Sequence, residues 1–165
     1  MFFVEEQYLN TQIQIDQSIS THTANHHQPI TRIECLESER LDFLPHYFGD
    51  ACVAFENRLY AFAQFLLPEY TGGYWSFHHL SNKGCLSALE RDEDSTLLLV
   101  SPNGFNARMD AVAASIVVNL MTMSDLSFAL QHQPSLCAQV SRLFHALRDY
   151  ALEHPKVNDI LAAID

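Results

Sequence analysis

The sequence predicts an α+β fold, in which one compact domain packs a small antiparallel sheet of about four strands with several helices. Apolar residues recur at helical spacing in two parts of the 165-residue chain, before and after its middle. Between these parts lie short alternating or apolar runs separated by turn-forming residues, as in antiparallel strands. A hydrophobic content of 48% over this length is enough to bury one sizeable core. Helices followed by strands and then by helices are typical of the α+β class.

Residues 1–29 differ in composition from the rest of the chain, since they are rich in Gln, Thr, Ser, Asn and His. Weak alternation is present at Ile13, Ile15 and Ile19. We expect a loosely ordered leader that adds a strand or a short turn to a domain at residues 30–165. The leader contains three clustered histidines, His22, His26 and His27. Without a predicted scaffold around them, they indicate a solvated polar segment and not a metal site.

Two helices are predicted before the strands. Apolar residues at helical spacing indicate the first over Glu37–Phe48, with Ser38 as its capping residue and Gly49 at its end. The second helix spans Phe55–Leu67, and Pro68 stops it. Its apolar stripe consists of Phe55, Leu59, Phe62, Ala63 and Leu66.

The middle of the chain predicts a meander of about four strands. These strands are Tyr74–Leu80, Cys85–Leu89, Thr96–Val100 and Phe105–Met109. The Asn103-Gly104 pair between the last two is favoured in tight hairpins. Because side chains alternate along a strand, the first strand has two predicted faces. One carries Tyr74, Ser76 and His78, and the other carries Trp75, Phe77 and His79.

Three helices complete the predicted fold. Asp110 is a good capping residue for Ala111–Gln131, and Pro134 suits the first turn of a helix that runs to about His154. Val157–Ile164 forms the last helix. The most apolar window, Met109–Met123, is too short to cross a bilayer. It is also interrupted by Ser115, Asn119 and Thr122.

Targeting and cysteine patterns favour a cytoplasmic protein without a membrane partner. Met1–Glu6 has no basic region and no long apolar run, so no signal peptide is expected. The four cysteines are Cys35, Cys52, Cys85 and Cys137. None of them forms a CxxC pair, and scattered cysteines are typical of small buried side chains in a reducing compartment.

The charge balance argues against direct binding of nucleic acid. The formal net charge is −11, and the only lysines are Lys83 and Lys156. A DNA-binding surface needs Lys and Arg to replace condensed counterions. Surplus acid suits solubility, attraction of a basic partner or imitation of DNA. Imitation requires dense acids along helices, yet the predicted helix Ala111–Gln131 contains only Asp125. An acidic DNA mimic therefore stays an alternative.

Two groups of residues have the composition of a reactive or metal site. Cys85 with His78 or His79 would suit a nucleophile and its base, or a pair of zinc ligands. Neighbouring histidines on a strand point to opposite faces, so only one of them reaches Cys85. The acidic run at residues 90–94 lacks the spacing of a calcium loop. We expect no catalytic residue, metal or cofactor, and a Cys/His hydrolase is kept as the second alternative.

The segment at residues 68–84 is the best candidate for a partner surface. Gly72 and Gly73 allow a close backbone approach but are not followed by a phosphate-binding pattern. Tyr74, Trp75 and Phe77 are of the type that dominates protein interfaces when exposed. The predicted contacts here are Glu69, Tyr70, Thr71, Gly72, Gly73, Tyr74, Trp75, Phe77, Ser81 and Asn82. An acidic C-terminal surface adds Asp149, Glu153 and Asp165.

Several segments resemble the ArdB/KlcA family of antirestriction proteins. The resemblance is carried by RLDFLPHYFG at residues 40–49, PEYTGGYWSF at 68–77, LSNKG at 80–84 and LRDYALEHP at 147–155, with AAID at the end. One departure lies at Lys83-Gly84-Cys85-Leu86, where the family has a small or aromatic run after Asn-Gly-Gly. That difference affects the surface of the hairpin and not the fold.

The resemblance implies a bacterial protein, often carried on plasmids or genomic islands, that relieves type I restriction while leaving modification largely untouched. It implies a compact α+β fold, unlike the extended acidic mimics of the ArdA type, and no catalytic residues. The implied partner is the type I restriction-modification complex or an associated host protein. A DNA mimic competing for the restriction enzyme's DNA site is the alternative mechanism.

Overall fold

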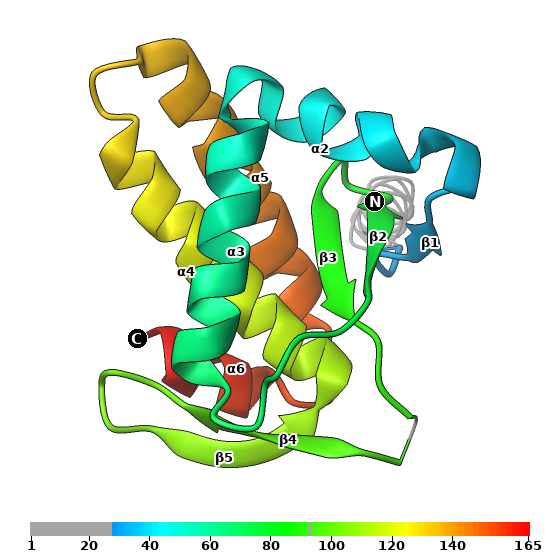
Figure 1. The fold of residues 1–165 in the computed structure, drawn as a ribbon, viewed down its shortest axis with the longest axis vertical. Coiled ribbons are helices and arrows are strands. Elements are labelled where there is room, and N and C mark those ends of the chain that lie inside the picture. Colours follow the sequence, from blue (N-terminus) through cyan, green and yellow to red (C-terminus); the bar gives the residue numbers. More distant parts are fainter. Residues whose placement is uncertain (1–27, 93) are drawn as a thin grey trace, which may run out of the picture.

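The central element of the protein is helix α4 (Ala111–Ala129), which lies between the other helices and the sheets (Figure 1). The computed structural model describes residues 28–92 and 94–165, so the predicted leader, with its alternation and its histidines, falls almost entirely outside the described residues. Every residue from Ala113 to Leu120 is buried. The predicted cap is confirmed, because the Asp110 carboxylate accepts the Ala113 N–H at 2.8 Å.

Among the described residues, α4 is the one helix long and apolar enough to cross a membrane by length and composition. Its mean hydropathy is 1.5, and 61% of the apolar window is buried inside the protein. A helix that is apolar on all sides is expected at the centre of a folded core, where neighbours cover it. The composition of α4 therefore fits its position in this fold.

The other helices surround α4. α3 (Cys52–Leu66) and α5 (Pro134–Leu152) pack along it, and the short α6 (Val157–Ile164) lies near the lower end of the bundle in Figure 1. The predicted stripe of α3 is confirmed at Phe55, Leu59, Ala63 and Leu66, which are buried, while Phe62 is half-buried. The helices predicted from Pro134 and from Val157 are likewise confirmed.

Helix α2 (Arg40–Phe48) crosses over the upper end of strands β2 and β3 (Figure 1). The predicted cap at Ser38 is wrong, because a 3₁₀ turn, η1 (Glu37–Glu39), precedes the helix and no side chain caps it. Gly49 ends α2 as predicted, with a φ of +52° that favours glycine. A second 3₁₀ turn, η2 (Gly49–Ala51), leads into α3.

The strands form two antiparallel sheets. One has the order β1-β2-β3, from β1 (Arg32–Glu34), β2 (Trp75–Leu80) and β3 (Cys85–Leu89). The other pairs β4 (Thr96–Val100) with β5 (Asn106–Asp110). The α+β class and all four predicted strands are confirmed, but the single meander is wrong. Side chains of α4 occupy the outer edge of β3, so β4 cannot pair there.

Candidate interaction surface

The segment that joins α3 to β2 is exposed at its centre. Glu69 and the run from Thr71 to Tyr74 are exposed, and Tyr70 is half-buried. Gly72 has a φ of +105°, a backbone conformation that side chains with a Cβ rarely adopt. A Cβ on Gly73 would lie 2.8 Å from the buried Leu89 side chain. The two glycines therefore let the segment turn tightly against β3.

Two polar contacts fix this segment to neighbouring strands. Arg108 on β5 donates to the Glu69 carboxylate at 2.5 Å, which links the segment to the second sheet. Hydrogen bonds from Arg108, together with one from the backbone of Leu98, lower the pKa of Glu69. Arg91 donates to the Gly72 carbonyl oxygen at 3.1 Å. The exposed part of the segment is thus held in a defined position.

Trp75 and Phe77 lie in the core and not on the surface. Their exposed fractions are 3% and 7%. The Trp75 indole N–H donates to the Tyr70 hydroxyl at 3.1 Å, and the Phe77 ring stacks on Phe43 of α2 with centroids 4.9 Å apart. Helix α2 covers the face of β2 that carries Phe77. The alternation of side chains along β2 therefore does not separate a solvent face from a core face. Both side chains position the segment and are removed from the predicted contacts.

Of the predicted aromatic contacts, Tyr74 alone is mainly exposed. Its exposed fraction is 53%. The Arg40 guanidinium lies 4.3 Å from the Tyr74 ring centroid and 4.6 Å from that of Phe77. Arg40 also donates to the Trp75 carbonyl oxygen at 2.7 Å. These contacts hold a rigid aromatic side chain at the surface, which is favourable for recognition because little side-chain entropy is lost on binding.

The predicted contacts at the β2–β3 turn have structural partners. The Ser81 hydroxyl accepts the Thr31 N–H at 3.0 Å, next to β1. The Asn82 amide donates to the Ala146 carbonyl oxygen of α5 at 2.7 Å, and its oxygen accepts the Gly84 N–H at 3.1 Å. Asn82 therefore fixes the turn against α5, and Ser81 fixes it to β1.

The three C-terminal acids have different neighbours in the structure. Asp149 is exposed on α5, one turn beyond Ala146. Glu153 accepts the Ile30 N–H at 2.7 Å, which fastens the start of the described chain to the end of α5. Asp165 lies beside Phe144 and Arg148, at a hollow between α5 and α6.

Cys85 and the histidines are not arranged as a reactive pair. His79 is directly opposite Cys85 in the sheet, but its Nδ1 contacts the Tyr47 hydroxyl at 2.8 Å. Complete burial raises the pKa of the Cys85 thiol well above its usual range. Burial, with a smaller effect of Cys85, also raises the pKa of Tyr47 to about 12. A nucleophilic cysteine needs a lowered pKa, so this environment favours an unreactive thiol.

Ser76, His78 and Glu90 form a polar cluster that the sequence pattern did not predict. Ser76 and His78 lie on the face of β2 opposite Phe77. The Ser76 hydroxyl donates to Glu90, and its oxygen contacts His78 Nε2 at 2.8 Å. Burial and the nearby Arg32 lower the pKa of His78. In a nucleophilic triad the serine hydroxyl donates to the histidine, whereas here it donates to the Glu90 carboxylate. His78 and Glu90 border a polar cleft of about 390 Å³ that Asp110 also lines.

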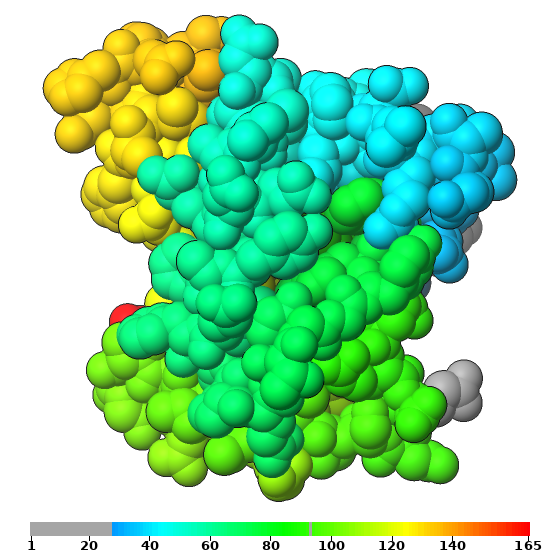
Figure 2. All heavy atoms as spheres, viewed as in Figure 1, coloured from blue at the N-terminus to red at the C-terminus, as the bar shows by residue number. Residues whose placement is uncertain are grey.

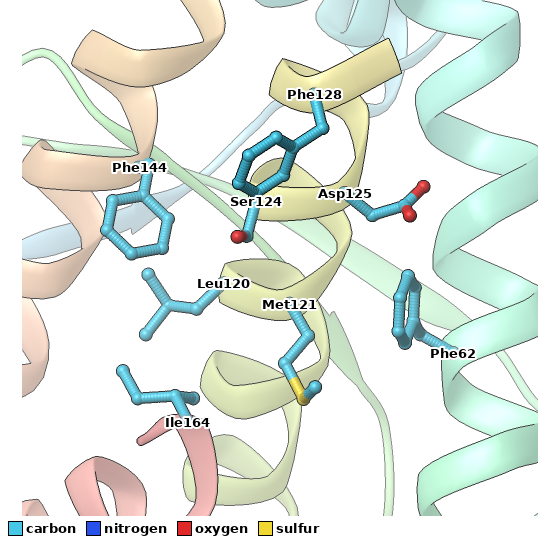
Figure 3. A pocket seen from close by; sticks show the side chains of 8 residues that line it. All are labelled: Phe62, Leu120, Met121, Ser124, Asp125, Phe128, Phe144 and Ile164. Atoms are coloured by element: carbon cyan, nitrogen blue, oxygen red, sulfur yellow. The ribbon is translucent and has the colours of Figure 1, made fainter. Parts of the chain in front are cut away.

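An apolar groove is a second feature without a sequence signal. It has a volume of about 280 Å³ and lies over α4, between Phe62 of α3 and Phe144 of α5 (Figure 3). Its one acidic side chain, Asp125, pairs with Arg58 at 2.8 Å. Among the described residues, no group of three or more His, Cys, Asp or Glu side chains is placed to hold a metal ion.

Comparison with known proteins identifies the family. A family model described as an antirestriction protein matches residues 68–165, more than half of the chain. The chain is 35% identical over 139 residues to the antirestriction protein KlcA of Escherichia coli, covering 84% of this chain and 96% of the relative. An uncharacterized protein of E. coli K12, YafX, is 35% identical over 132 residues, covering 78% and 84% of the two chains.

A solved structure has the same fold. It aligns with a TM-score of 0.76 and 34% identity over 84% of this chain and 96% of its own. It is described as showing that the KlcA and ArdB proteins have a novel fold and antirestriction activity against Type I DNA restriction systems in vivo but not in vitro. The chain belongs to the ArdB/KlcA family of antirestriction proteins. The family resemblance noted in the sequence is thereby confirmed.

In this antirestriction protein, the family match begins at Pro68, directly before the exposed segment at residues 69–74. It includes both sheets except β1, and it includes α4, α5 and α6. The matched part therefore contains Tyr74 and the two glycines. Helix α2, which covers β2 and supports Arg40, precedes it.

Proposed function

We propose that this protein relieves type I restriction in the bacterial cytoplasm by presenting a folded surface to another protein, without catalysis or a cofactor. The observation that carries the proposal is the structural match to KlcA and ArdB, which extends over most of both chains. The partner is the type I restriction-modification complex or a host protein associated with it. Modification of the DNA is expected to continue, as the family resemblance implies.

Of the two proposed partners, the activity of the relatives favours a host protein over the restriction enzyme itself. Their activity against type I systems is described as present in vivo but not in vitro. A direct competitor of the enzyme would act in both settings, because mixing the two purified proteins would suffice. A host component, absent from the purified reaction, accounts for the difference. We extend this inference to the present chain.

The exposed segment at residues 69–74 supports recognition by contact. It is held by ion pairing at Glu69 and by the burial of Trp75, so that Tyr74 is displayed from a fixed backbone. Pre-organised aromatic side chains on a rigid support are typical of interface hot spots. The environment of Cys85 offers no support for the hydrolase alternative.

The acids on the two long helices are not distributed as in a DNA mimic. On α4 the only carboxylate, Asp125, is paired with Arg58. On α5 the exposed Asp149 follows Arg148, and Arg142 lies on the same helix. A mimic would need rows of unpaired carboxylates spaced like phosphates.

The test is a plating experiment with unmodified phage on a strain that carries a type I restriction system. Expression of the protein should raise the efficiency of plating toward that of a non-restricting strain. Phage recovered from these cells should carry the host modification. Equal plating with and without the protein, at confirmed expression, would remove the proposal. The same protein should show no nuclease, protease or esterase activity after purification.

A further inference from the structure

The surface around helix α2 combines exposed apolar side chains with unpaired acids. Leu41 is 89% exposed, the most exposed large apolar side chain among the described residues. Ile33 and Leu36, on and just after β1, are 69% and 64% exposed. Single exposed apolar residues are ordinary, but several within one short stretch of chain favour an interaction site. In Figure 2, η1 and α2 (blue to cyan) project from this face of the molecule.

The charge of this surface is mainly negative. From Ile33 to Asp50 there are five carboxylates, Glu34, Glu37, Glu39, Asp42 and Asp50. The single Arg or Lys in that stretch is Arg40, and its guanidinium is stacked between aromatic rings. Within the described chain, none of the first four carboxylates forms an ion pair or a side-chain hydrogen bond. Glu34, Glu37 and Glu39 contribute, after burial, to the raised pKa of Cys35.

Hollows lie on both sides of α2. One, of about 290 Å³, is lined by Glu39, Asp42, Phe43, His46 and His79. It has an aromatic floor and an acidic rim, which suits the apolar stem and charged end of a Lys or Arg side chain. The other, also about 290 Å³, lies beside Leu41, Val53 and Tyr60, and Arg40 and Glu56 also line it. Leu41 borders this second hollow.

We propose that the α2 surface, formed by residues 33–46 and its two flanking hollows, docks a basic amphipathic segment of a partner protein. The apolar side of that segment packs on Leu41 and the hollow beside it, while a Lys or Arg enters the hollow bordered by Glu39 and Asp42. This inference deepens the proposed function and rests on it, since it defines the chemistry of the partner. The surface is continuous with Tyr74, which stacks on Arg40 at the edge of α2.

Charge complementarity selects this occupant over the other possibilities. A second copy of the chain would bring another net charge of −11 against the same acids. Residues 1–27 contain Glu5, Glu6 and Asp16 but no Lys or Arg, so they do not neutralise the surface either. Nucleic acid is repelled by it. A basic segment gains from both the apolar and the charged parts.

The first test compares matched variants in the plating experiment. Leu41→Ser removes an exposed apolar side chain, and Phe65→Ser does the same at a 62% exposed position of α3. The double variant Glu39→Lys with Asp42→Lys reverses the rim charge, and its control, Asp92→Lys with Asp94→Lys in the β3–β4 loop, changes the net charge by the same amount. We expect the α2 variants to lose protection by about tenfold or more, with unchanged thermal stability, because they remove interface contacts. The controls should protect like the wild type.

The outcomes separate this inference from the proposed function. If the wild type protects and both α2 variants protect equally well, the docking inference is wrong while the proposed function stands. Equal losses in the α2 variants and the controls would also overturn it. If the wild type itself gives no protection, the proposed function fails first.

The second test identifies what lies on the surface. A photo-crosslinking amino acid at position 41 is activated in restricting cells, and the linked peptide is sequenced. A segment with an excess of Lys and Arg and regularly spaced apolar residues supports the inference. Linkage to an acidic segment, to residues 1–27, to a second copy or to nucleic acid overturns it.

Discussion

Asn119 on α4 binds both backbone polar groups of Ser87 on β3. Its side-chain oxygen accepts the Ser87 N–H at 3.2 Å, and its amide nitrogen donates to the Ser87 carbonyl oxygen at 2.8 Å. Ser115, one turn earlier, accepts the Leu89 N–H at 2.9 Å. A helix thus supplies hydrogen bonds that a neighbouring strand would otherwise give. This arrangement ends the first sheet at β3 inside the core.

Replacing Asn119 with Ala should destabilise the protein by about 3 kcal/mol, because two buried backbone groups lose their partners. Asn119 is fully buried, so water cannot replace the lost bonds. The measurement is the free energy of unfolding in urea. Asn119→Asp should also be destabilising, since it places a carboxylate against the Ser87 carbonyl oxygen. A loss below about 1 kcal/mol in Asn119→Ala would show that these bonds contribute little net stability.

Thr122, on the same helix, gives the opposite prediction. Its hydroxyl is buried and has no hydrogen-bond partner among the described residues. Thr122→Val keeps the shape and removes the unsatisfied group, so the protein should become more stable by up to about 1 kcal/mol. Urea unfolding of the two single variants, measured side by side, provides the comparison. A clear loss of stability in Thr122→Val would mean that the hydroxyl has a partner, such as a buried water.

The helices were predictable because their signals are local. Asp110 begins α4, Pro134 begins α5, and Gly49 ends α2, each through backbone chemistry that involves only near neighbours. The separation of the sheets was not predictable in this way. It depends on Asn119 and Ser115, which in the sequence were only interruptions of an apolar run. Their partners Ser87 and Leu89 lie 32 and 26 residues away.

The candidate surface was predicted in part. The turn at Gly72 and Gly73 follows from residue type, and the structure exposes it. The burial of Trp75 and Phe77 depends on the packing of α2 and α3 over β2, which alternation within one strand does not encode. The α2 surface was not predicted, because the helical spacing of its residues does not show which apolar side chains stay exposed. Leu41 is an example.

Tyr74 and Trp75 should respond differently to substitution. Tyr74→Ser removes an exposed ring and its contact with Arg40, so stability should fall by less than about 1 kcal/mol. Protection against restriction should nevertheless decrease, because the displayed ring is lost. Trp75→Ala removes a core side chain and should cost about 3–5 kcal/mol. Plating efficiency and thermal denaturation of both variants test this. Full protection by a stable Tyr74→Ser protein would exclude that ring from the contact surface.

Cys85 should behave as a buried, unreactive thiol. A thiol reagent such as DTNB should modify Cys85 only after unfolding, whereas Cys35, Cys52 and Cys137 are partly exposed and should react earlier. Cys85→Ala should retain protection while losing about 1–2 kcal/mol of stability from the small cavity. Abolished protection in a folded Cys85→Ala protein would instead favour the hydrolase alternative. Rapid modification of Cys85 in the native state would do the same.

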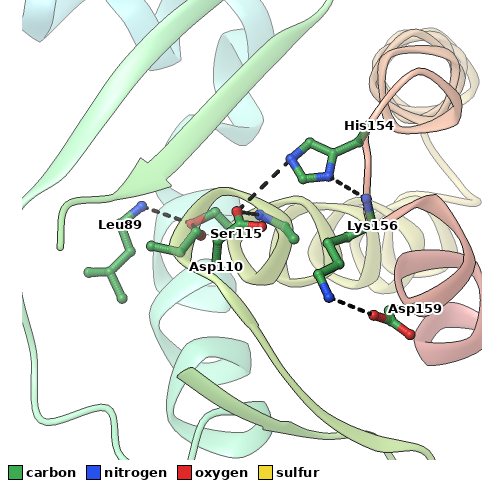
Figure 4. A network of polar contacts seen from close by, with 8 residues as sticks. Leu89, Asp110, Ser115, His154, Lys156 and Asp159 are labelled. Carbon is green, nitrogen blue, oxygen red and sulfur yellow. Dashed lines mark hydrogen bonds and ion pairs between the residues drawn. The ribbon is translucent and has the colours of Figure 1, made fainter. Parts of the chain in front are cut away.

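Stability should fall as the pH drops below neutrality. Burial lowers the pKa of both His78 and His154 below the ordinary histidine value of 6.5, and Arg32 lowers both further. Asp110 opposes this at His154, with its carboxylate 3.9 Å from Nε2 at the start of α4 (Figure 4). Below pH 6.5 the unfolded chain therefore binds more protons than the folded chain, so stability decreases until the pH passes the lowered pKa values.

Thermal denaturation between about pH 7.5 and about pH 5.5 measures this effect. In the wild type the Lys156 N–H donates to His154 Nδ1 at 3.1 Å. The variant His154→Asn retains an acceptor for this N–H, but the asparagine side chain cannot be protonated in this pH range. The variant should therefore lose less stability than the wild type over the same interval, while the two should differ little at the upper end. An identical pH dependence in both proteins would show that His154 does not titrate differently in the folded and unfolded states.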